Sequence, residues 1–310
     1  MEFDIIGDIH GHSSALQAFL THLGYQDRNG AWRHPSRQAL FVGDFIDRGP
    51  GQLETVEIVR KMVDAGTARA VMGNHEFNAI AWHTPDPLAP GEYLRPHSGD
   101  IGRKNHHQHQ HFLAEVSDKR IHAETIDWFL TLPLWLDLPA LRVVHACWNE
   151  EAMAALEPLL TPERQLTREL MVHASRPGRI EFRSAECLTK GIEVPLPDGH
   201  TFFDKDGHER GSVRIRWWEN NAHSYRALAL MPERDLHRIP DVALPAGTVC
   251  GYTGPKPVFF GHYWMQGTPA PVSPAAACVD YSVAKGGKLV AYRFSAGEPL
   301  SAQNFAWAGH

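Results

Sequence analysis

Three short apolar segments near the N-terminus each end in a polar, glycine-containing loop, and this repetition constrains the fold more than any other feature. The segments cover 2–6, 39–42 and 68–72, and the loops after them read GDIHGHSS, GDFIDRGP and GNHE. A stretch with helical spacing follows each loop. Alternating strands and helices predict stacked layers around a largely buried sheet. Ligands bind beyond the carboxyl ends of the strands in such sheets, so the three loops mark a candidate site.

The polar residues at the predicted strand ends form a mixed set of oxygen and nitrogen donors. Each follows a short apolar run, and together they are Asp8, His10, Asp44, Asn74, His145 and His262. Taken singly, an Asp or Asn at such a place is also a common turn or helix-capping residue. Three oxygen donors with three imidazoles suit manganese, iron or zinc better than magnesium or calcium. If Asp44 is shared, two ions lie roughly 3.5–4 Å apart and acidify a water between them towards a pKa of about 7.

The composition is typical of a soluble globular protein. Of the 310 residues, 43% are apolar and 21% are charged, and the formal net charge is -6. This charge does not indicate nucleic-acid binding, although a basic patch can still assemble in the folded chain. The N-terminus leads directly into a strand, without a basic and apolar leader, and no long apolar run follows. We therefore expect a cytoplasmic protein without a membrane partner.

The four cysteines do not suggest a structural site. Cys147, Cys187, Cys250 and Cys278 are far apart and include no C-x-x-C pair. This spacing predicts neither a zinc ribbon nor a disulfide framework. We expect isolated thiols in a reducing compartment.

Two segments interrupt the pattern, and we predict a single domain over 1–310 with insertions at about 83–118 and 176–220. The first is rich in Pro and Gly and then contains HHQHQH at 106–111, which fits a surface excursion ending in a helix. His107 and His111 are four residues apart, as in some metal sites, but a solvated helix surface is the simpler interpretation of this run. Both insertions are expected to shape specificity.

Five motifs give a more specific indication. GDIHG, GDFIDRGP, GNHE, VVHAC and FFGHYW occur in this order between residue 7 and the segment around 262, and CVDYSVAKGGKLVAYRF follows near the C-terminus. This series resembles the signature of the calcineurin-like metallophosphoesterases. The GDxxDRG form is similar to their phosphoprotein-phosphatase branch, which includes bacterial Ser/Thr phosphatases and diadenosine tetraphosphate hydrolases. The resemblance implies an α/β fold, a four-layer α/β/β/α sandwich with mixed sheets.

The resemblance also implies a ligand set for two divalent metal ions, with manganese favoured and iron or zinc as alternatives. The first ion would be held by Asp8, His10 and Asp44, and the second by Asp44, Asn74, His145 and His262. Many relatives outside this branch have a second histidine two residues after the last ligand. Trp264 stands there in this chain. We therefore expect the first ion to keep an open position for water or a phosphate oxygen.

Further residues acquire catalytic or substrate-binding roles through the same resemblance. His75 would protonate the leaving alkoxide, and Asp47 would orient His75. Arg48 would bind phosphoryl oxygens beside Asn74, unless Asp47 and Arg48 merely form a local ion pair. The branch usually has a second phosphate-binding arginine between the last two histidine ligands. The candidates are Arg176, Arg179, Arg214 and Arg216, of which we favour Arg216.

These roles predict a phosphoester hydrolase in which a metal-bridging hydroxide attacks directly and no phosphoenzyme forms. Our main hypothesis for its substrate is a phosphomonoester of a protein or small molecule. One alternative substrate is a dinucleoside polyphosphate such as diadenosine tetraphosphate. A related alternative is a nucleic-acid end, on which the protein would act as a phosphatase or phosphodiesterase. Another is a catalytically weak metal-binding scaffold, which His75 and Arg48 disfavour because neither serves metal retention. The sequence does not determine the oligomeric state.

Overall fold

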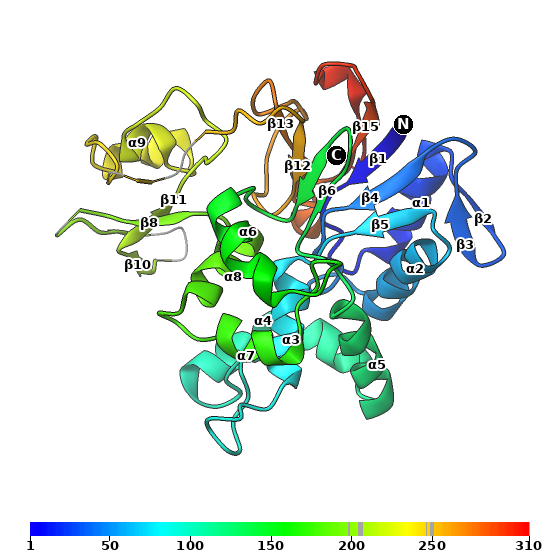
Figure 1. Ribbon diagram of the computed structural model, residues 1–310, viewed down its shortest axis with the longest axis horizontal. Coiled ribbons are helices and arrows are strands. Elements are labelled where there is room, and N and C mark those ends of the chain that lie inside the picture. The colour runs from blue at the N-terminus through cyan, green and yellow to red at the C-terminus, as the bar shows by residue number, and fades with distance from the viewer. Residues whose placement is uncertain (198, 204–206, 246, 249–250, 310) are drawn as a thin grey trace.

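The computed structural model describes residues 1–197, 199–203, 207–245, 247–248 and 251–309. Two mixed β-sheets lie at its centre, with helices around them (Figure 1). In the first sheet β1, β4 and β5 are parallel and β15 runs antiparallel to β1. Its strands, in spatial order, are β14 (Asp280–Tyr281), β15 (Lys288–Ser295), β1 (Glu2–Ile6), β4 (Gln38–Phe41) and β5 (Ala68–Ala70), and β16 (Phe305–Ala308) also pairs with β15.

The second sheet is built from later parts of the chain. Its order is β13 (Ala276–Cys278), β12 (Val258–Phe260), β7 (Arg142–Val144) and β6 (Trp135–Asp137). Strands β13, β12 and β7 are parallel, and β6 is antiparallel to β7. Parallel strands place their carboxyl ends at one edge, so the residues after β7 and β12 share an edge as those after β1 and β4 do.

Strand alternation explains how the two sheets pack. Ile5, Leu40 and Val290 of the first sheet form one apolar core with Val143 and Phe259 of the second. Successive side chains of a strand point to opposite faces, so the neighbouring strand residues pack outwards against helices. The four-layer arrangement with mixed sheets that the family resemblance implies is therefore confirmed.

Helices cover the outer faces of both sheets. The first sheet is covered by α1 (Ser13–Leu23) and α2 (Gln52–Asp64). The other α-helices before residue 200 are α3 (Asn74–His83), α4 (Gly99–Glu115), α5 (Lys119–Phe129), α6 (Glu150–Leu156), α7 (Arg168–Ala174) and α8 (Ile180–Lys190). Helix α8 belongs to the main body, because its Leu188 carbonyl accepts from the backbone N–H of Ala146 and Leu188 lies in the main core.

The segment after α8 has a small core of its own. It contains β8 (Glu193–Pro195), β9 (Phe202–Phe203), β10 (Glu209–Arg210), β11 (Ser212–Arg214) and α9 (Tyr225–Leu228). Val194, Ile215 and Leu228 are buried together there. This part lies to one side of the sheets in Figure 1. The expected second insertion at 176–220 thus combines a helix of the main body with the start of this segment. Elsewhere in the chain, β2 (Gln26–Arg28) and β3 (Ala31–Arg33) form a separate hairpin.

Two smaller expectations concern membranes and thiols. Among the described residues, no helix has the length and apolar character that crossing a bilayer requires. Cys187 and Cys278 are free thiols, and Cys147 is buried. Cys250 lies outside the described residues.

Candidate metal centre

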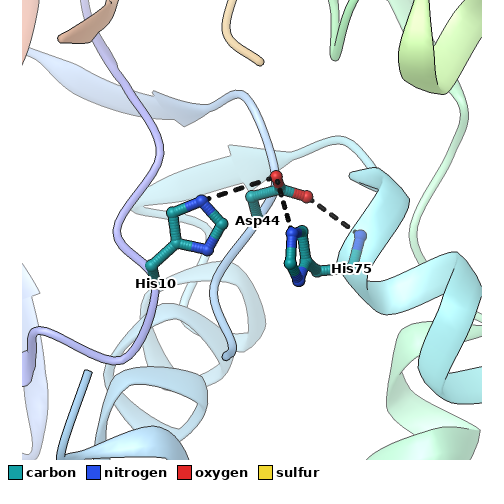
Figure 2. A group of neighbouring side chains, drawn as sticks. All are labelled: His10, Asp44 and His75. Carbon is teal, nitrogen blue, oxygen red and sulfur yellow. Dashed lines mark hydrogen bonds and ion pairs between the residues drawn. The ribbon is translucent and has the colours of Figure 1, made fainter. Parts of the chain in front are cut away.

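The loops after β1, β4, β5, β7 and β12 converge and bring the six predicted ligands together. Asp8, His10 and Asp44 are each 2% exposed and His145 is fully buried. Ligand-type atoms of His10, Asp44 and His75 lie within 4.8 Å of one another, and so do those of Asp44, His145 and His262. Asp44 therefore belongs to both groups, and Figure 2 shows the first of them.

Asp44 divides its carboxylate between the two groups. Its Oδ2 atom lies 3.7 Å from Nε2 of His10 and 3.8 Å from Nε2 of His75. Its Oδ1 atom lies 3.4 Å from Nε2 of His145. That same nitrogen of His145 is 3.2 Å from Oδ1 of Asn74. A carboxylate with imidazoles on both sides has the placement expected of a bridging ligand.

Backbone contacts orient two of the imidazoles. Nδ1 of His10 donates to the carbonyl of Ile46 at 2.9 Å, and Nδ1 of His145 donates to the carbonyl of Val42 at 2.7 Å. A carbonyl only accepts, so in both rings Nδ1 carries a proton and Nε2 is the ring atom left to face the cluster. Nε2 of His10 is buried without a hydrogen-bond partner in the described part of the chain. Such an orphaned donor atom fits a metal ligand.

Asp8 joins the cluster from β1. Its Oδ2 atom accepts the backbone N–H of His262 at 3.1 Å, while Oδ1 is buried without a hydrogen-bond partner among the described residues. Burial, then the charges of Asp280 and Asp44, raise the pKa of Asp8 well above its usual value. Burial and Asp44 also raise the pKa of Glu76 to about 7. So many crowded carboxylates favour cations in their midst.

Two of these acids, Glu76 and Asp280, had no role in the sequence analysis. Glu76 accepts backbone N–H groups of Asp44 and Phe45 at 2.8 Å each and of Gly73 at 3.0 Å, which ties the loop after β4 to the start of α3. Asp280 accepts the backbone N–H of Trp264 at 2.8 Å and so supports the turn after His262. Glu76 is the last residue of the motif GNHE, and Asp280 lies in CVDY. Their positions inside these motifs were the signal in the sequence that could have indicated a role for them.

Unusual backbone conformations and close packing mark the same region. Nine non-glycine residues in the described ranges have positive φ, and six of them are His10, Asp44, Asp47, Arg48, His262 and Trp264. Concentration of such conformations is typical of functional sites. There is also no space for a side chain at Gly261, because a Cβ atom there would lie 2.0 Å from Oδ1 of Asp8.

His75 and Asp47 form a buried pair next to the metal cluster. Nδ1 of His75 lies 2.5 Å from Oδ2 of Asp47. Burial alone lowers the pKa of His75, but Asp44 and Asp47 outweigh it, and the net shift is upwards. Burial alone raises the pKa of Asp47, but His109 and His75 outweigh it, and the net shift is downwards. The pair is therefore stabilised as imidazolium and carboxylate.

Arg48 stacks on an aromatic ring beside this pair. Its Cζ atom lies 4.5 Å from the ring centroid of Trp264, and Nζ of Lys285 lies 3.3 Å from the same centroid. This position differs from a local ion pair with Asp47, whose two carboxylate oxygens face imidazoles. Stacking holds the guanidinium without using up its hydrogen-bond donors.

The four candidate arginines lie in different surroundings. Nη1 of Arg214 lies 3.0 Å from Nε2 of His262. Arg216, which the sequence analysis favoured, instead donates to the carbonyl of Ala227. Ile215 of the small core lies between the two arginines, and the backbone N–H of Arg216 donates to the carbonyl of Leu228 in the same core at 2.8 Å. Arg176 pairs with Asp86, and Arg179 with Glu181.

The histidine-rich run is only in part a solvated helix surface. His107 and His111 are exposed on α4. His109 is 3% exposed, and its Nδ1 donates to Oδ1 of Asp47 at 2.7 Å. The expectation for this run is therefore wrong for His109. Phe112 lies three positions further along the helix, and the centroids of the two rings are 4.9 Å apart. The helical spacing of His109 and this apolar residue on α4 was the available signal.

Comparison with known proteins agrees with this architecture. A Ser/Thr phosphatase from Saccharomyces cerevisiae superposes with a TM-score of 0.51 at 14% sequence identity, covering 100% of this chain and 79% of the other, and so shows a shared fold. A model of the calcineurin-like phosphoesterase family matches residues 1–262. The chain therefore belongs to the calcineurin-like phosphoesterase family.

Curated relatives match a shorter segment. The asymmetrical bis(5'-nucleosyl)-tetraphosphatase PrpE of Halalkalibacterium halodurans is 47% identical over 76 residues, which is 24% of this chain and 31% of that protein. The same enzyme of Oceanobacillus iheyensis is 43% identical over 76 residues, which is 24% of this chain and 30% of that protein. The match thus spans about a third of these relatives' length.

Proposed function

We propose that the protein hydrolyses phosphoric esters or anhydrides with two divalent metal ions. The observation that carries this proposal is that Asp44 belongs to two clusters of candidate ligands, one with His10 and His75 and the other with His145 and His262. The ligands would be Asp8, His10, Asp44, Asn74, His145 and His262. Their mixed oxygen and nitrogen donors suit manganese, with iron or zinc as alternatives. A cytoplasmic location is part of the proposal.

The chain's own residues then do the remaining work. Bound ions would activate water and neutralise phosphoryl charge. Arg48, held on Trp264, offers a planar pair of donors to the phosphoryl oxygens. His75 donates the proton on Nε2 to the leaving oxygen, while its Nδ1–H remains bonded to Asp47. The upward shift in the pKa of His75 favours the doubly protonated ring that this step requires.

The position of Arg214 suggests a change in the substrate-binding set. Its guanidinium lies beside His262 and also pairs with Glu193 at 2.9 Å. A guanidinium at the edge of the cluster can turn towards a phosphoryl group that the ions hold. We therefore assign the second phosphate-binding role to Arg214 in place of Arg216, together with Arg48 and Asn74.

Two substrate classes remain in the proposal. The buried acid pair of His75 and Asp47 suits a phosphomonoester with a poor leaving group, which needs a proton as it departs. The name of the PrpE relatives supports a dinucleoside polyphosphate. A nucleic-acid end is a variant of the second class, and a weakly active scaffold leaves the pair of His75 and Asp47 without a purpose.

A substrate panel with added manganese tests the proposal. It contains an aryl phosphate, an aryl phosphodiester, a phosphopeptide and a dinucleoside tetraphosphate. We expect turnover of at least one substrate and a fall of roughly 10²- to 10⁴-fold in His75→Asn with metal content retained. Preference for the phosphopeptide or the dinucleotide decides between the two classes. No turnover of any substrate by metal-loaded protein supports the scaffold and contradicts the proposal.

A further inference from the structure

The carboxylate of Asp47 is held from both sides by imidazoles that come from different parts of the chain. Its Oδ2 atom faces Nδ1 of His75 at 2.5 Å, and its Oδ1 atom faces Nδ1 of His109 at 2.7 Å. The side chains of Asp47 and His109 are 3% and 4% exposed. An ionised carboxylate only accepts, so each Nδ1 carries a proton and donates it to Asp47.

The contact with Asp47 accounts for the buried position of His109. Nε2 of His109 is buried without a hydrogen-bond partner among the described residues. Its ring otherwise packs against apolar or aromatic neighbours, with centroid distances of 4.9 Å to Phe112 and 6.3 Å to Trp82. Burying the polar atoms of an imidazole costs free energy, and an apolar side chain would fill the same space without that cost. The hydrogen bond to Asp47 is therefore the reason for a histidine at this position.

Helix α4, which carries His109, is also fixed to the segment 47–53 at a second point. The side chain of Glu115 accepts the backbone N–H groups of Gln52 and Leu53 at 2.9 Å each. The side chain of Gln52 in turn accepts the backbone N–H of Asp47 at 2.5 Å. The inserted helix therefore supports both the side chain and the backbone of Asp47.

We propose that His109 is a positioning residue that fixes the orientation of Asp47 and, through it, of the proton donor His75. A carboxylate with a single hydrogen bond can rotate about its last side-chain bond. The second hydrogen bond from His109 fixes the plane of the carboxylate, so that Oδ2 stays in line with Nδ1 of His75. This inference rests on the proposed role of His75 as the acid for the leaving group.

The test compares substrates that differ in their need for a proton. An alkyl phosphate leaves as a strongly basic alkoxide, whereas an aryl phosphate leaves as a weakly basic phenolate. In His109→Leu we expect kcat for the alkyl phosphate to fall by about 10- to 100-fold, as for other supporting contacts, and kcat for the aryl phosphate to change by less than about threefold. KM should change little for either substrate, because His109 contacts neither the phosphoryl group nor the metal ligands.

Two further variants separate positioning from general damage. His109→Asn places an amide N–H near the position of Nδ1 and should restore most of the alkyl phosphate turnover. His111→Ala changes an exposed histidine of the same helix and should behave as wild type. Equal losses for both substrates in His109→Leu, or no rescue by His109→Asn, would overturn the proposal.

A measurement without turnover distinguishes this inference from the proposed function. Imidazole N–H protons bonded to a carboxylate give separate signals in a nitrogen-edited proton spectrum. We expect the Nδ1–H signal of His75 to persist in His109→Asn and to shift or broaden in His109→Leu. An unchanged signal in His109→Leu contradicts positioning by His109. A changed signal with equal activity losses for both substrates in His75→Asn supports the positioning and rejects the acid role of His75.

Discussion

The carboxylate of Glu76 accepts the backbone N–H of Asp44 at 2.8 Å and is completely buried. A buried acid thus holds the residue that we propose as the bridging ligand. Because like charges crowd together here, the cluster is stable only when the charge is reduced by protons or by metal ions. The stability of the metal-free protein should therefore depend on pH.

We expect the metal-free protein to lose stability as the pH rises from about 6.5 to 8. The pKa of Glu76 is raised to about 7, and the pKa values of Asp8 and Asp280 are also raised, so the folded state binds more protons than the unfolded chain in this range. His75 and His145 have raised pKa values and act in the same direction. Each full proton contributes about 1.4 kcal/mol per pH unit.

Urea unfolding of chelator-treated protein at both pH values measures this effect. The pKa of His10 is lowered to about 3 in the folded protein, whereas its value in the unfolded chain is near 6.5. Its contribution to stability therefore changes with pH mainly below 6.5, and it does not oppose the trend above that value. Excess manganese should remove the dependence, and Glu76→Gln should reduce it. A free energy of unfolding that stays level or rises with pH in the metal-free protein would show that these carboxylates are not crowded as described.

Asp44→Asn should abolish activity and reduce the bound metal. The substitution removes the charge that faces His10, His75 and His145 together, so both proposed ions lose a ligand. We expect a loss of at least about 10³-fold in kcat/KM, because metal activation of water contributes several kcal/mol. Elemental analysis and turnover measure the effect. Asp127→Asn, an exposed acid paired with Arg168, is the control, and full metal content in Asp44→Asn would refute the bridging role.

Gly261→Ala should disrupt the site through space alone. The new methyl group would lie 2.0 Å from Oδ1 of Asp8 and 2.8 Å from Cγ2 of Val42. We expect a stability loss of about 1–3 kcal/mol and a lower metal affinity, because Asp8 must move. Gly211→Ala provides the matched control, since nothing lies within 4 Å of its Cβ position. Calorimetry and metal titration measure both effects, and equal behaviour of the two variants would contradict the packing argument.

Arg214→Ala and Arg216→Ala should differ in substrate binding. Arg214 lies 3.0 Å from the ring of His262, while Arg216 contacts the carbonyl of Ala227. Loss of a charge-assisted contact to a phosphoryl group predicts a fall of roughly 10- to 100-fold in kcat/KM for Arg214→Ala. Arg216→Ala should stay within about twofold of wild type. Steady-state kinetics on the best panel substrate provide the comparison, and the reverse order would return the role to Arg216.

The sequence by itself determined the parts of this protein that depend on local pattern. Alternating apolar residues, helical spacing and glycine-flanked polar loops placed Asp8, Asp44 and Asn74 at strand ends. Parallel strands end at a common edge, so the convergence of these residues could be anticipated without coordinates. The motifs near His145 and His262 extended the same reasoning to the second sheet.

Only the tertiary structure decided which side chains from distant segments complete the site. His109 belongs to a run that looks solvated, and the docking of α4 against the start of α2 turns this one histidine inwards to Asp47. Arg214 and Arg216 are two residues apart, and the end of β11 determines which of them meets His262. The spacing of residues along a helix or strand determines which side chains share a face. Which other segment packs against that face depends on contacts between distant parts of the chain, and the local spacing does not encode them.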